Sequence, residues 1–151
     1  MTEINRKASA FWNGDVGSSK GLINTESMAL FEQPYSFLAR FGNESGTSPE
    51  ELIAAAHAAC FSMVLAVTLK RHGFESEKTD TAATCTVVSK NGSHEIIRMQ
   101  LHVRAAVPDI DESEFRKLGN EADQSCPVSN LLRNGLDIKI ESTLQETNKV
   151  L

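Results

Sequence analysis

The chain contains 151 residues, of which 40% are hydrophobic and 23% are charged. This size and composition suit one packed domain, so we expect residues 1–151 to form a single domain with a frayed tail at 145–151. Fifteen basic and twenty acidic residues give a net charge of −5, which disfavours a nucleic-acid partner. No secretory signal follows Met1, and no stretch reaches 18 uncharged apolar residues. We therefore expect a cytoplasmic protein with no membrane partner.

Three short strands are predicted near the N-terminus, at 7–13, 20–27 and 33–41. Asn13-Gly14 ends the first of them with a pair of residues typical of hairpin turns. In the third segment, aromatic and small residues alternate on one face. Arg40 then lies on the opposite face, or where the strand ends.

A long helix is predicted next, at about 49–72. Ser48 and Glu51 have the spacing of a capping box, and Pro49 suits the first helical position. Between 52 and 69 the segment is apolar on nearly every side, which is typical of a helix that is buried all round. One small domain can hardly bury so long a helix, so we expect a second subunit to help.

The rest of the chain predicts two strands, two short helices and a last strand, at 79–90, 95–107, 111–123, 126–134 and 136–144. The two long strands are joined by Asn91-Gly92, a strong hairpin signal. Hairpins and grouped strands favour an α+β fold with antiparallel sheets over a doubly wound parallel sheet.

The three cysteines are too few for a disulfide scaffold, and a bonded pair in a reducing compartment would be catalytic or sensing. Cys60 lies inside the long helix, where a buried cysteine is commonly a packing residue. Cys126 lies at the N-cap of a proline-led helix, where free N–H groups and the helix dipole favour a thiolate. The alternative is that Cys126 is simply a poor cap. We interpret Cys85, which alternates with threonines in a strand, as packing.

Two motifs surround these cysteines: the segment SPEELIAAAHAACFSM from Ser48 to Met63, and Cys126-Pro127-Val128-Ser129. Shorter motifs lie at 11–15, 33–41 and 107–111. In this order and at this separation they resemble the OsmC/Ohr family, the osmotically inducible and organic hydroperoxide resistance proteins. The resemblance covers nearly the whole chain and is closest to the OsmC branch.

The resemblance implies a thiol-dependent peroxidase that uses no metal or organic cofactor, with antiparallel sheets around the long helix of an intertwined homodimer. It implies that Cys60 attacks the peroxide and becomes a sulfenic acid, and that Cys126 then forms a disulfide with it. The family's activating pair falls on Arg40 and Glu50. A guanidinium offsets the desolvation of a buried thiolate, and a carboxylate holds the guanidinium in place.

The resemblance also implies a role in oxidative and osmotic stress defence, with a dithiol reductant for which a lipoyl protein is one candidate. We expect organic hydroperoxides to be preferred, because an apolar wall that includes Phe61 and Met63 would suit an alkyl group.

The spacing of Glu50 and Cys60 has a geometric consequence. They are ten residues apart on one helix, which is about 15 Å along its axis and too far for a glutamate side chain. We therefore expect an obligate homodimer with two interface sites. Each site would take Arg40 and Glu50 from one chain and Cys60 and Cys126 from the other.

Two other functions remain open on the sequence. A redox-sensing or ligand-binding domain would use the cysteines without turnover. A structural zinc site would use His57, one helical turn before Cys60, together with both cysteines, but no fourth ligand is evident. We favour a core histidine.

Overall fold

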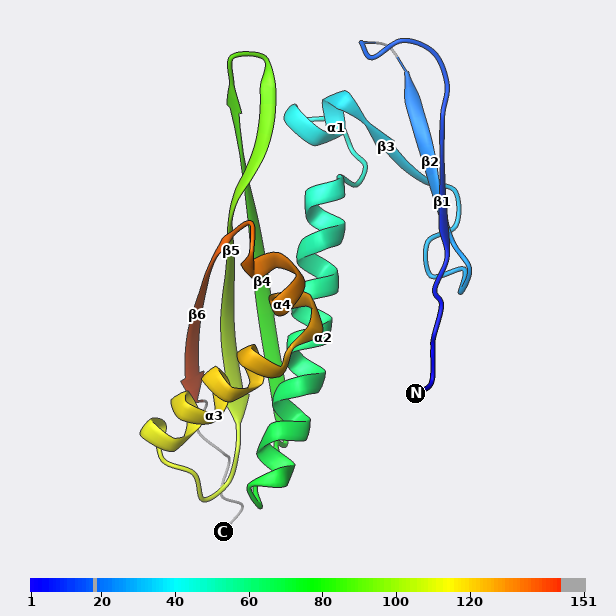
Figure 1. Ribbon diagram of the computed structural model, residues 1–151. Coiled ribbons are helices and arrows are strands. Elements are labelled where there is room, and N and C mark those ends of the chain that lie inside the picture. The colour runs from blue at the N-terminus through cyan, green and yellow to red at the C-terminus, as the bar shows by residue number, and fades with distance from the viewer. Residues whose placement is uncertain (18, 145–151) are drawn as a thin grey trace. The chain divides into compact units, whose positions relative to one another are not determined.

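The computed structural model describes residues 1–17 and 19–144 (Figure 1). The expected frayed tail at 145–151 lies outside the described residues. The chain divides into two compact parts, residues 1–52 and 53–151. The single domain over residues 1–151 stays a prediction.

Ten helices and strands are assigned within the described residues. They are, in chain order, β1 (Ala8–Trp12), β2 (Lys20–Thr25), β3 (Gln33–Ser36), α1 (Phe37–Phe41), α2 (Pro49–Arg71), β4 (Lys78–Lys90), β5 (Ser93–Ala106), α3 (Glu112–Ser125), α4 (Pro127–Arg133) and β6 (Asp137–Leu144). The α+β class is confirmed. The helix α2 begins at the end of the first part and continues into the second.

The first part contains an antiparallel sheet in the order β1-β2-β3. The prediction of a strand over 33–41 is wrong in its second half, because β3 ends at Ser36 and α1 follows at once. The Ser36 hydroxyl accepts a hydrogen bond from the Ala39 N–H at 2.9 Å and so caps α1. This local bond replaces the strand ladder. Arg40 consequently lies in the last turn of a short helix.

The start of α2 has the predicted cap. The Ser48 hydroxyl accepts a hydrogen bond from the Glu51 N–H at 3.1 Å, and Pro49 is the first helical residue. The Glu51 carboxylate accepts a hydrogen bond from the Thr47 hydroxyl at 2.6 Å, so it too is engaged in the first turn. The chain leaves the helix at Gly73, whose φ of +85° lies in the left-handed region.

One face of α2 is in the core and another is not. Phe61, Leu65 and Leu69 are fully buried, whereas Met63 and Val67 are 65% and 51% exposed. By length and composition alone α2 is long and apolar enough to cross a membrane, a property that it shares with the core helices of soluble proteins. The sequence predicts that α2 is buried on every side. Within one chain it is not, because Met63 and Val67 are exposed.

In the second part, β4 and β5 form a long antiparallel hairpin that turns at Asn91 and Gly92, with φ of 52° and 79°. The last strand differs from the antiparallel expectation, because β6 pairs parallel to β5. The helices α3 and α4 supply the crossover that a parallel pair requires. The core joins α2, β5 and α3 around side chains that include Phe61, Leu65, Leu101, Val103, Phe115 and Leu118.

Candidate thiol site

The two motif cysteines lie side by side in the second part of the chain. Cys60 is on α2, Cys126 lies between α3 and α4, and their sulfurs are 3.5 Å apart. Both are free thiols; Cys126 is fully buried and Cys60 is half-buried. Because a disulfide needs about 2.05 Å, the sulfurs are adjacent but unbonded. The pairing implied by the family resemblance is thus geometrically available.

Cys126 occupies the corner between two helices. It is the C-cap of α3, where its N–H donates to the Asp123 carbonyl at 3.2 Å, and the N-cap of α4, which Pro127 begins. The predicted N-cap position is confirmed, but the Cys126 side chain makes no capping hydrogen bond. The free amide of Val128, in the first turn of α4, instead interacts with the Cys60 sulfur.

The pKa of Cys60 lies above its ordinary value. Burial is the largest cause, and neighbouring Cys126 raises the pKa further, while the Val128 amide lowers it. A thiol with a raised pKa is mostly protonated at neutral pH and is a weak nucleophile. Burial within the second part of the chain therefore disfavours the Cys60 thiolate, an effect that a neighbouring cation would counter.

Arg40 and Glu50 form a forked ion pair in the first part. Arg40 Nε donates to both carboxylate oxygens of Glu50, at 2.9 and 3.1 Å, and Arg40 Nη2 donates to Oε1 as well. The Arg40 guanidinium also lies 4.7 Å from the centre of the Phe41 ring. Burial raises the pKa of Glu50, but hydrogen bonds from Arg40, the helix backbone and Ser48 outweigh it and leave that pKa below its ordinary value.

Arg40 and Glu50 are thus bonded to each other in the first part of the chain, and Cys60 and Cys126 lie side by side in the second. The predicted role of Arg40 and Glu50 toward Cys60 stays a prediction. On the continuous helix α2, Glu50 and Cys60 are ten residues apart, about 15 Å along the axis.

His57 is bonded within the core. Its Nε2 lies 2.8 Å from the Ser129 hydroxyl, and both residues are fully buried. Burial lowers the pKa of His57, and Arg133 lowers it further, against the opposing effect of Asp123. Among the described residues, no group of three or more His, Cys, Asp or Glu side chains could hold a metal ion, so the zinc alternative has no ligand set there.

Sequence reasoning did not single out Ser129. The signal was present, because Ser129 is the fourth residue of the second cysteine motif, but its partner is 72 residues away in the chain.

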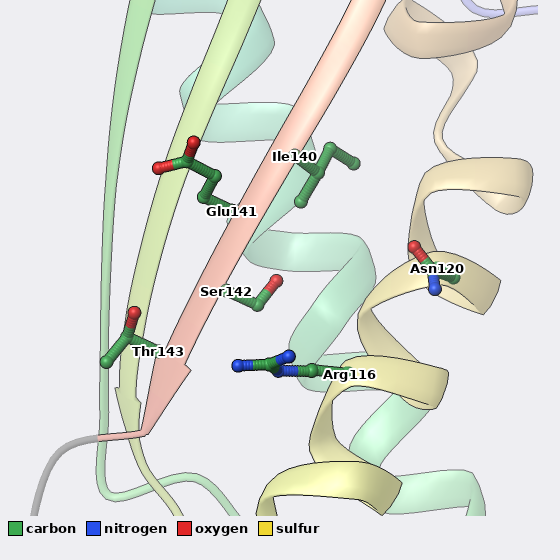
Figure 2. A pocket seen from close by; sticks show the side chains of 6 residues that line it. All are labelled: Arg116, Asn120, Ile140, Glu141, Ser142 and Thr143. Carbon is green, nitrogen blue, oxygen red and sulfur yellow. The ribbon is translucent and has the colours of Figure 1, made fainter.

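Several hollows lie near these elements. One, of about 800 Å³, lies between α2 and the β4–β5 hairpin, and its lining includes Ala59 and Ser62. An apolar groove of about 240 Å³ lies between α2 and the two residues that flank Cys126; neither cysteine is in its lining, which consists of Met63, Val64, Val67, Thr68, Arg71, Ser125 and Pro127. Phe61, which was expected in such a wall, is instead fully buried in the core. Another hollow, about 400 Å³, lies between α3 and β6. Figure 2 shows Ile140 and Ser142 turned toward α3, where Arg116 and Asn120 lie; this hollow has no cysteine in its lining.

One family of known proteins matches most of this chain. The sequence model of one family, described as "OsmC-like protein", matches residues 42–141, a stretch that contains Glu50, Cys60 and Cys126. This chain belongs to the OsmC-like protein family. The family resemblance expected from the sequence is thereby confirmed.

Relatives of this OsmC-like protein have informative names. The chain is 44% identical over 130 residues to "Peroxiredoxin OsmC" of Escherichia coli, covering 86% of this chain and 91% of the relative. It is 31% identical over 98 residues to an "Organic hydroperoxide resistance protein" of Xanthomonas axonopodis, covering 63% and 66%.

Solved structures share the fold. The crystal structure of the organic hydroperoxide resistance protein OhrB of Bacillus subtilis has a TM-score of 0.71 at 25% identity, covering 91% of this chain and 98% of that one. An organic hydroperoxide resistance protein from Elizabethkingia anophelis has a TM-score of 0.78 at 24% identity, covering 95% and 99%.

Proposed function

We propose that this OsmC-like protein is a thiol-dependent peroxidase that reduces organic hydroperoxides through Cys60 and Cys126. The observation that carries the proposal is the pair of unbonded thiols 3.5 Å apart, one on α2 and one at the α3–α4 corner. The name of its E. coli relative, Peroxiredoxin OsmC, supports the same chemistry.

The reaction has two balanced steps. In the first, the Cys60 thiolate attacks the distal peroxide oxygen, the O–O bond breaks, and the alkoxide takes up a proton and leaves as an alcohol. Cys60 is oxidised to a sulfenic acid and the peroxide is reduced. In the second, the Cys126 sulfur attacks the sulfenic sulfur, the S–O bond breaks, and water leaves as the disulfide forms. A dithiol then reduces the disulfide and returns both thiols.

We assign the activation of Cys60 to Arg40, held by Glu50. A guanidinium beside the thiolate counters the burial that raises the Cys60 pKa. Because Glu50 cannot span the 15 Å or so to Cys60 on its own helix, we assign the two pairs of one site to two subunits of a homodimer. The exposed apolar residues of α2, including Met63 and Val67, support a subunit contact along this helix.

Substrate, reductant and setting follow from the same proposal. The apolar groove between α2 and the residues that flank Cys126 suits the alkyl part of an organic hydroperoxide. The reductant is a dithiol, with a lipoyl protein as one candidate. We place the activity in the cytoplasm, in oxidative and osmotic stress defence.

Counting free thiols over seconds tests the proposal. The reduced protein receives one equivalent of an alkyl hydroperoxide or of hydrogen peroxide. We expect rapid loss of two thiols, faster with the alkyl hydroperoxide. Cys60→Ser should abolish this loss, and Cys126→Ser should stop at a sulfenic acid that a dimedone reagent traps.

Cys85→Ser is the matched control, and it should still lose two thiols. Repeated turnover with a dithiol separates the enzyme from the alternative of a redox-sensing or ligand-binding domain, which oxidises once. Loss of thiols at the rate of a free cysteine contradicts the proposal.

A further inference from the structure

A buried hydrogen bond joins the two helices that carry the thiol pair. His57 on α2 and Ser129 on α4 are both fully shielded from solvent, and the imidazole Nε2 lies 2.8 Å from the serine hydroxyl. The other ring nitrogen, Nδ1, is buried without a hydrogen-bond partner in the structure. A buried ring nitrogen without a hydrogen-bond partner costs free energy, so the position of His57 calls for an explanation.

The bond stands one helical turn from each sulfur. His57 precedes Cys60 by three residues on α2, where residues three apart lie on the same face. Ser129 is the third residue of α4, and Cys126 is the N-cap of that helix. The hydrogen bond and the sulfur pair are therefore two adjacent links between the same two helices.

The other side of Cys126 is fastened within its own corner. Arg133 Nη2, in the last turn of α4, donates to the Asp123 carboxylate at 2.7 Å and to the Asp123 carbonyl at 3.3 Å, in the last turn of α3. This ion pair ties α3 to α4 around the cysteine but does not reach α2. The contact between His57 and Ser129 joins the corner to the helix of Cys60, alongside the interaction of the Val128 amide with the Cys60 sulfur.

We propose that His57 is a positioning residue for disulfide formation: through Ser129 it holds α4 in register with α2, so that the Cys126 sulfur stays beside Cys60 after Cys60 is oxidised. The inference rests on the proposed function. It concerns the second step only, in which the S–S bond forms, the S–O bond of the sulfenic acid breaks and the hydroxyl leaves as water with the thiol proton. Reaction of Cys60 with peroxide forms no bond to Cys126, so loss of His57 should slow the first step less than the second; the effect on the first step is limited to the contact of the Val128 amide with the Cys60 sulfur.

Single-turnover kinetics test this assignment. The rate of peroxide consumption measures sulfenic acid formation. The loss of dimedone-reactive sulfur measures disulfide formation. In His57→Leu and Ser129→Ala we expect the second step to slow about tenfold, as expected for loss of one buried hydrogen bond, with a clearly smaller effect on the first step. His57→Gln presents an amide where Nε2 lies and should restore most of the rate.

The control is His72→Leu, which removes a histidine from the same helix. His72 bonds Glu121 of α3 at the surface, at 3.0 Å, and its loss should leave both steps unchanged. The inference is overturned if His57→Leu forms the disulfide at the wild-type rate, or if both steps slow by the same factor.

A redox-buffer titration keeps the inference testable without peroxide. The Cys60–Cys126 disulfide is equilibrated with oxidised and reduced dithiothreitol. We expect the equilibrium constant for forming the protein disulfide from the two thiols to fall about tenfold in His57→Leu and Ser129→Ala. It should stay at the wild-type value in His72→Leu. If wild-type protein forms no sulfenic acid with any peroxide, the proposed function fails. The titration still decides whether His57 holds the two thiols together. Equal equilibrium constants in all variants would overturn the inference.

Discussion

At the scale of single residues, the forked pair of Arg40 and Glu50 is the interaction expected to control reactivity. Glu50→Gln keeps the side-chain shape and removes the charge that orients the guanidinium. Because charge-assisted hydrogen bonds contribute about 1.5–3 kcal/mol, we expect the second-order rate of Cys60 with an alkyl hydroperoxide to fall at least about tenfold.

A matched control lies next to it in the chain. Glu51 is also in the first turn of α2, but it bonds Thr47 rather than Arg40. Glu51→Gln should change the rate constant by less than about twofold. Equal losses in the two variants would show that charge at the helix start, and not the fork, controls the rate.

His57 also predicts a pH dependence of stability. Burial holds its folded-state pKa below the ordinary value of 6.5, so only the unfolded chain takes up a proton as pH falls through 6.5. The free energy of unfolding should decline from pH 6.5 down to the folded-state pKa. The contribution of Glu50, whose pKa is also lowered, is lost only as pH falls below 4.5.

Urea unfolding at pH 7.5 and pH 5.5 measures this contribution. His57→Gln cannot be protonated and should lose less stability between the two pH values than wild type. The rest of the chain is the same in both proteins, so the difference between the two declines reports on residue 57. Identical declines would assign the pH dependence to groups other than His57.

At the scale of elements, the β4–β5 hairpin depends on its turn. Gly92 has a φ of +79° with open space around its Cα, so Gly92→Ala is strained by backbone conformation alone. We expect a loss of about 1 kcal/mol in urea unfolding. Gly135→Ala is the control, because Gly135 has no positive φ and its added Cβ would meet only ordinary contacts, so its effect should be near zero. A comparable loss in both would point to a general effect of removing glycine.

The elements also show how far local sequence patterns reach. Caps, turns and periodicity predicted α2, the β4–β5 hairpin and α3 because each depends on residues close together in the chain. The third strand was predicted too long, because the short bond from Ser36 to Ala39 ends it in a way that alternation does not reveal. The parallel partner of β6 was not predicted, since that choice depends on the crossover through α3 and α4.

In the candidate site too, some features could be predicted from the sequence and others depend on tertiary packing. Cys126 at a helix cap follows from Cys126-Pro127 alone, and the family resemblance assigned Arg40, Glu50 and Cys60. The bond between His57 and Ser129 was out of reach, because their partnership arises only when α4 packs against α2, 72 residues apart in the chain.

At the scale of the whole molecule, the proposed dimer predicts complementation. Cys60→Ser and Glu50→Gln chains are unfolded, mixed equally and refolded together. Random pairing under two-fold symmetry makes half of the dimers mixed, and each mixed dimer regains one complete site. We expect peroxidase activity of about a quarter of wild type, measured by consumption of an alkyl hydroperoxide with excess dithiol.

Mixing Cys60→Ser with Cys126→Ser chains is the control. Both cysteines of one site belong to the same chain in the proposal, so this mixture should regain no turnover. Recovery in the control, or an active monomer in sedimentation, would contradict the proposed arrangement of the dimer.

The position of Cys126 between α3 and α4 has a consequence for how a reductant recognises the oxidised protein. The sulfurs need to approach by only about 1.5 Å to bond, and Cys126 lies between two helices rather than inside either. Oxidation can then proceed without unwinding α3 or α4. The two redox states should have nearly the same outline, so a reductant has no changed surface by which to tell them apart. It must discriminate by reaching the disulfide itself, which favours a slender dithiol on a flexible tether over a broad protein surface.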